Sequence, residues 1–122
     1  MKQKLTENQT SWLADLRSGE YEQGTGQLHC KNKFCCLGVA AKKFATAETV
    51  IVGDSIGHTY DGENVNAPQY VVAALNLYGD VGNTSPEFDG ECLETLNDDG
   101  ATFAEIADLI EEDPSRFFRA GT

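Results

Sequence analysis

The chain has 122 residues, 40% of them apolar, which suffices for one domain around a single core. Its 20 acidic residues outnumber nine Lys and Arg, and the formal net charge of −11 opposes direct binding to nucleic acids or anionic membranes. No run of about 18 apolar residues occurs and no apolar signal region begins the chain, so we expect residues 1–122 to form a single cytoplasmic domain that does not enter a membrane.

The charge is unevenly distributed along the chain. Residues 1–45 hold seven basic and four acidic residues, a sum of +3, whereas residues 46–122 hold two basic and 16 acidic residues, a sum of −14. No Lys or Arg occurs from Phe44 to Ser115. An anionic small molecule would therefore bind in the N-terminal third, and a basic protein surface would meet the C-terminal third.

The first half of the chain contains two predicted helices separated by a glycine-rich stretch. Thr6 to Gln9 has the pattern of a capping box, and it predicts a helix that stops near Gly19. Residues 20–28 are too rich in glycine for a helix and predict a turn or hairpin. The mostly apolar segment 34–45 predicts a buried helix with a basic C-terminal end.

The middle of the chain predicts a hairpin and a third helix. Residues 50–52 and 56–60 flank a Gly53-Asp54 turn and have the composition of two short strands. Pro68 then opens a helix that ends at Gly79, because proline is tolerated in a first turn and glycine favours a helix end.

The C-terminal third combines a loop with short helices. Residues 80–90 predict a loop, and residues 92–96 predict one or two helical turns closed by the acidic turn 97–100. A second capping box begins a helix at Thr102, which Pro114 ends, and we expect Phe117 and Phe118 to dock the C-terminal tail on the core. The elements together predict an α+β domain, with three or four helices packed on a small antiparallel hairpin or sheet.

The four cysteines have poor spacing for a metal site. Cys30, Cys35, Cys36 and Cys92 do not form the Cys-x2–4-Cys pairs typical of zinc, and neighbouring helical residues point about 100° apart. We therefore expect reduced, buried thiols with no metal and no cofactor. No Ser/His/Asp, Cys/His or paired-carboxylate arrangement stands out, and the isolated His58 is more typical of a structural residue, so no enzymatic activity is predicted.

A glycine-rich loop with basic flanks is the candidate site for an anionic ligand. Glycine N–H groups and nearby cations suit a phosphate. The alternative is that these glycines only satisfy the geometry of a turn. The candidate ligand-binding residues are Arg17, Tyr21, Gln23, Gly24, Gly26, Lys31 and Lys33.

A cluster of acidic residues in the C-terminal third is the candidate surface for a basic partner. The helix beginning at Thr102 is typical of the first helix of a helix-turn-helix, but the acidic residues that follow it oppose phosphate and argue against DNA binding. The acidity could equally serve solubility alone. The candidate partner-binding residues are Glu91, Glu94, Asp98, Asp99, Asp108, Glu111, Glu112 and Asp113.

Two blocks of sequence resemble a family of small proteins encoded by tailed phages and prophages. The first block is Leu16 to Leu28 followed by Phe34 to Ala40, and the second is Leu96 to Glu111. This family has no assigned activity, so the resemblance implies a phage origin, and hence the cytoplasm of the host cell, without implying a mechanism.

Phage accessory proteins of this size commonly bind and disable host machinery, so the resemblance leads to two hypotheses. In the first, the acidic surface binds a basic host protein and counteracts a host defence system. In the second, the N-terminal third sequesters a small, cyclic or linear, nucleotide immune signal, with Tyr21 or Trp12 stacking on the base. The oligomeric state stays open, and a homodimer is compatible with the sequence.

Overall fold

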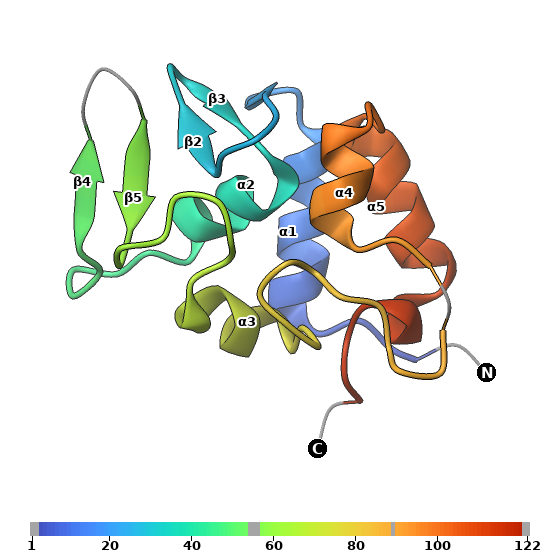
Figure 1. Cartoon of the computed structure of the whole chain (residues 1–122). Coiled ribbons are helices and arrows are strands. Elements are labelled where there is room, and N and C mark those ends of the chain that lie inside the picture. Colours follow the sequence, from blue (N-terminus) through green and yellow to red (C-terminus); the bar gives the residue numbers. More distant parts are fainter. Residues whose placement is uncertain (1–2, 54–56, 89, 121–122) are drawn as a thin grey trace.

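A computed structural model of the protein describes residues 3–53, 57–88 and 90–120 (Figure 1). These residues contain five α-helices and five short strands. The strands lie at one end of the molecule and most of the helical mass lies at the other, so the predicted α+β class is confirmed. None of the described helices is long and apolar enough to cross a bilayer. The helices are α1 (Glu7–Arg17), α2 (Cys36–Lys43), α3 (Gln69–Leu75), α4 (Leu93–Asp98) and α5 (Phe103–Glu112), with a 3-10 turn η1 (Pro114–Arg116).

The two predicted capping boxes are both present. The Thr6 hydroxyl accepts the Gln9 N–H at 3.1 Å, and the Gln9 side chain accepts the Thr6 N–H at 2.9 Å. Thr102 and Glu105 make the same reciprocal pair at the start of α5, with the same two distances. Each box satisfies backbone donors that a helix start leaves without intrahelical partners.

Three helix boundaries differ from the predicted ones. Phe34 belongs to a strand, so α2 begins only after Cys35, whose sulfur accepts the Gly38 N–H at 3.3 Å. Helix α3 ends at Leu75, because Asn76 adopts a left-handed conformation with φ of 56°. Helix α4 has six residues, which agrees with the predicted one or two turns, but it ends at Asp98, two residues beyond the predicted end at Leu96.

A mixed three-stranded sheet replaces the hairpin predicted for residues 20–28. The strands are β1 (Glu22–Gln23), β2 (His29–Cys30) and β3 (Lys33–Phe34), in the order β1-β3-β2. Strands β2 and β3 form an antiparallel hairpin, whereas β1 runs parallel to β3. The hairpin turn consists of Lys31 and Asn32, whose φ angles of 52° and 67° match a two-residue turn that suits the twist of the strands.

The second predicted hairpin is confirmed. Strands β4 (Ile51–Gly53) and β5 (His58–Tyr60) are antiparallel, with Ile51 opposite Tyr60. The predicted turn residue Asp54 and the predicted strand residue Ile56 lie outside the described residues.

One apolar cluster connects the helices to the sheets. Helix α1 contacts α2, α3 and α5, and Trp12 in its centre is fully buried. The Trp12 ring meets the Phe118 ring edge-on at 6.3 Å. Phe117 and Phe118 are both fully buried, which confirms that the C-terminal tail docks on the core.

Gly38 allows α2 to touch the backbone that precedes β2. A Cβ atom at position 38 would overlap the carbonyl of Leu28. In an open helix, replacing glycine by alanine stabilises by about 1 kcal/mol. We predict that Gly38→Ala instead destabilises by about 2 kcal/mol or more, because backbone atoms must move apart. Urea unfolding measures the change, and a variant as stable as the native protein would contradict this packing.

Candidate functional site

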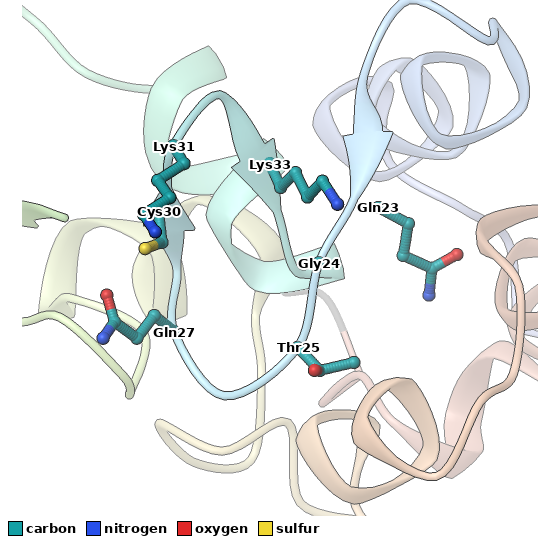
Figure 2. Close-up of a pocket in the computed structure, with 7 residues that line it drawn as sticks. All are labelled: Gln23, Gly24, Thr25, Gln27, Cys30, Lys31 and Lys33. Atoms are coloured by element: carbon teal, nitrogen blue, oxygen red, sulfur yellow. The ribbon is translucent and has the colours of Figure 1, made fainter. Parts of the chain in front are cut away.

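An open pocket lies between the loop that follows β1 and the β2–β3 hairpin. Its volume is about 360 Å³. Figure 2 shows Gly24 and Thr25 on one side of the pocket, Gln27, Cys30 and Lys31 on the other, and Lys33 between them. The lining residues are Gln23, Gly24, Thr25, Gln27, Cys30, Lys31 and Lys33.

The loop is held to the protein through its backbone. The Gly24 N–H donates to the Phe34 carbonyl at 2.8 Å, and the Gly24 carbonyl accepts from the Asn97 side chain at 2.8 Å. The Gly26 N–H donates to the Asp98 carboxylate at 3.0 Å. Both glycine donors are therefore engaged by protein acceptors, and direct binding of an anion by Gly24 and Gly26, which would have to displace these acceptors, stays a prediction.

The amide of Gln23 supports the pocket from behind. It donates to the Asn97 side-chain oxygen at 2.9 Å and to the Ala101 carbonyl at 2.7 Å. Its own oxygen accepts the Phe103 N–H at 3.0 Å. In Figure 2 the Gln23 side chain extends toward the helices, so its contribution is to position the loop.

Asn97 completes this network from inside the core. Its side chain is fully buried, and its oxygen also accepts the Cys36 N–H at 3.1 Å at the start of α2. A buried amide is tolerated only when its donors and acceptors are paired, as they are here. The sequence offers one signal for this role. The polar Asn97 directly follows Leu96 in a helix whose Leu93 and Leu96 side chains pack in the core region.

The cationic groups of the pocket are Lys31 and Lys33. Both residues are exposed. The Lys33 ammonium lies 3.8 Å from the Glu22 carboxylate, but both side chains are more than half exposed. This ion pair therefore contributes little to stability, and another anion can replace Glu22 beside Lys33. The Thr25 hydroxyl and the Gln27 amide add neutral hydrogen-bonding groups to the lining.

Arg17 lies outside the pocket. Its guanidinium pairs with Asp108 at 2.6 Å and with Glu111 at 2.7 Å, which joins α1 to α5. The hydrogen bond to Asp108 is the largest of the effects that raise the pKa of Arg17. The charge predicted to attract a ligand is therefore neutralised within the protein.

The two aromatic side chains proposed for base stacking also lie outside the lining. The Tyr21 ring packs edge-on against Phe34, with 5.2 Å between centroids. Trp12 is fully buried and donates its indole N–H to the Cys36 carbonyl at 3.1 Å. No aromatic residue belongs to the described pocket lining.

The predicted acidic patch is divided by internal contacts. Besides the two residues paired with Arg17, Asp98 accepts the Gly26 N–H, and Asp113 accepts the Ser115 hydroxyl at 2.7 Å. Glu94 is half-buried, and burial followed by the charge of Asp98 raises its pKa. The exposed members without a described contact of this kind are Glu91, Asp99 and Glu112.

The cysteines occupy two environments. Cys35 and Cys36 are buried, and burial raises the pKa of Cys35 to about 11 and raises that of Cys36 as well, so neither is a nucleophilic thiolate. Cys30 and Cys92 are half-buried, in contrast to the expected burial of all four. The described residues contain no group of three or more His, Cys, Asp and Glu side chains arranged to hold a metal ion.

A stack of three rings next to the pocket joins the two sheets. The His29 ring lies 4.0 Å from the Phe34 ring and 3.9 Å from the His58 ring, nearly parallel to the latter. The His29 Nδ1 is 2.8 Å from the Tyr60 hydroxyl. Burial, then the neighbouring His58 and Lys42, lower the pKa of His29 from 6.5 to about 4.

The family to which the chain belongs is identified by its sequence. Residues 1–114 match the model of a domain of unknown function, DUF8296. The chain belongs to the DUF8296 family. No curated protein and no solved structure gave a significant match.

The His29 stack predicts a loss of stability in acid. Because the pKa of His29 is about 4 in the folded state and 6.5 in the unfolded state, the fold favours the neutral ring. The stability that comes from neutral His29 is complete above pH 6.5 and is lost as the pH falls toward about 4. Relative to a His29→Phe variant, which keeps a stacked ring, the native protein should lose at most about 3 kcal/mol over this range. Urea unfolding of both proteins at several pH values measures the difference. Parallel pH profiles would contradict the prediction.

Proposed function

We propose that this protein is a non-catalytic binding protein that holds a small phosphate-bearing ligand in the pocket between Gly24 and Lys33. The observation that carries the proposal is the presence of two exposed lysines on one pocket of about 360 Å³ in a protein of net charge −11. Pockets of roughly 300–1,000 Å³ suit small ligands. A preformed cationic pocket in an otherwise acidic protein favours an anion.

The chemistry of the lining indicates how such a ligand would be held. Lys31 and Lys33 provide point charges, and Thr25 provides a hydroxyl, all of which suit phosphate oxygens. Because the described lining contains no aromatic ring, most of the affinity would come from phosphate and little from stacking on a base. Nucleotides and simpler phosphates are therefore expected to differ less in affinity than they would at a base-reading site.

The contacts of the acidic residues favour this proposal over binding of a basic host protein through the patch predicted from the sequence. Asp108 and Glu111 share the single positive charge of Arg17, and Asp98 holds the pocket loop. The resemblance to phage proteins suggests sequestration of a nucleotide signal in the host cell as the biological role, and that role is part of the proposal.

Thermal denaturation with a ligand panel tests the binding. The panel contains inorganic phosphate, pyrophosphate, and linear and cyclic nucleotides. A ligand present at 100 times its dissociation constant should stabilise the folded state by about 2.7 kcal/mol. The Lys33→Ala variant should weaken the binding by about tenfold, the loss of one charge-assisted hydrogen bond.

Lys4→Ala is the matched control, because it removes the same charge at an exposed position outside the pocket. It should bind as the native protein does. Equal weakening by Lys33→Ala and Lys4→Ala would mean that only net charge matters, and the absence of any shift across the panel would refute the proposal.

A further inference from the structure

Strand β4 is the outer strand of its hairpin and carries the most exposed apolar residues of the described chain. Val50, Ile51 and Val52 are 62%, 47% and 58% exposed. Figure 1 shows β4 at the far end of the molecule, with β5 between it and the rest of the protein. Both faces of the strand are open, because neighbouring residues on a strand point to opposite sides.

The backbone of β4 also faces outward at defined positions. The Asp61 N–H donates to the Val50 carbonyl at 2.7 Å, which makes Val50 and Asp61 a hydrogen-bonded pair. Such pairs alternate along antiparallel strands, so Ile51, opposite Tyr60, forms a non-hydrogen-bonded pair. The N–H and C=O groups of Ile51 and Gly53 therefore point away from β5, toward the open edge.

Apart from its shortness of three residues, this edge lacks the usual protection against pairing with another strand. Proteins commonly protect exposed edges with lysine, proline or a bulge. Strand β4 has the sequence Ile-Val-Gly preceded by Val50, with none of these features. The hairpin is also held in place, since the His58 ring stacks on His29 at 3.9 Å and the Tyr60 hydroxyl meets the same residue. An incoming strand would thus find an ordered template.

The surroundings of β4 are acidic. Glu48, Asp61 and Glu63 are exposed close to it in the chain, and no Lys or Arg occurs between Phe44 and Ser115. The Asp61 carboxylate is fixed by accepting the Val50 N–H at 2.7 Å. These carboxylates lie at the Val50 end of the strand, so the edge is complementary to an apolar strand with basic residues at one end.

We propose that the β4 edge binds an extended segment of a partner protein that contains alternating apolar residues and Lys or Arg at one end. The segment adds to the sheet as a third strand next to β4. Its backbone bonds to Ile51 and Gly53, its apolar side chains cover Val50 to Val52, and its basic end meets the three carboxylates near Val50. This interaction is separate from the pocket and does not depend on the ligand proposed for it.

The charge distribution favours such a partner over a second copy of the chain. Pairing β4 with β4 of another copy would bring together two molecules that each carry a net charge of −11. Like charges placed across an interface are destabilising.

Fluorescence anisotropy with two labelled peptides tests the proposal. Both are seven residues long with alternating valine and threonine, and they end in lysine in one peptide and in glutamate in the other. The lysine peptide should bind at least tenfold more tightly, with an affinity that falls as salt rises. Val52→Lys should weaken this binding at least tenfold, and Ile51→Pro, which removes an outward N–H, should abolish it.

The controls separate the edge from net charge and from the pocket. Ala104→Lys adds the same charge at an exposed position on α5, and Lys33→Ala alters only the pocket; both should bind the lysine peptide as the native protein does. Circular dichroism should show all variants folded. Equal affinity for the two peptides, no saturable binding, or a native protein that sediments as a dimer disrupted by Val52→Lys would each overturn the proposal.

Discussion

The hydrogen-bond network formed by the side chains of Gln23 and Asn97 is the interaction on which the site depends. Asn97 lies in α4, accepts from the start of α2 and donates to the loop at Gly24. Gln23 lies in β1 and bonds to Ala101 and to the start of α5. Two amides thus connect a strand, a loop and three helices. A network of this kind is stabilising only when complete, because any unpaired member is costly in the interior.

This network also determines what the pocket can offer to a ligand. Gly24 and Gly26 give their N–H groups to protein acceptors, which ties the loop to the rest of the protein and leaves the side chains of Thr25, Lys31 and Lys33 to recognise the proposed ligand. A loop ordered before binding loses less entropy when a ligand arrives. The ion pairs of Arg17 with α5 also affect what the pocket offers, because they leave Lys31 and Lys33 as its positive charges.

The sequence predicted the features that depend on local patterns. Both capping boxes, the β4–β5 hairpin and the buried tail at Phe117 follow from residues close together in the chain. It did not predict contacts between distant segments. The parallel pairing of β1 with β3 and the ion pairs of Arg17 with α5 depend on tertiary packing, which spacing does not encode. Four of the seven candidate ligand residues line the pocket, because loop and hairpin are neighbours in sequence, whereas Asn97 lies 73 residues from Gly24.

A double-mutant cycle between Gln23 and Asn97 tests the central claim most directly. The free energy of unfolding is measured by urea denaturation for the native protein, Gln23→Ala, Asn97→Ala and the double variant. If the two amides act as one network, the cycle should give a coupling energy of about 1 kcal/mol or more, since removal of either residue already breaks the shared bonds. Effects that add to within about 0.5 kcal/mol would show two independent residues and would contradict this account.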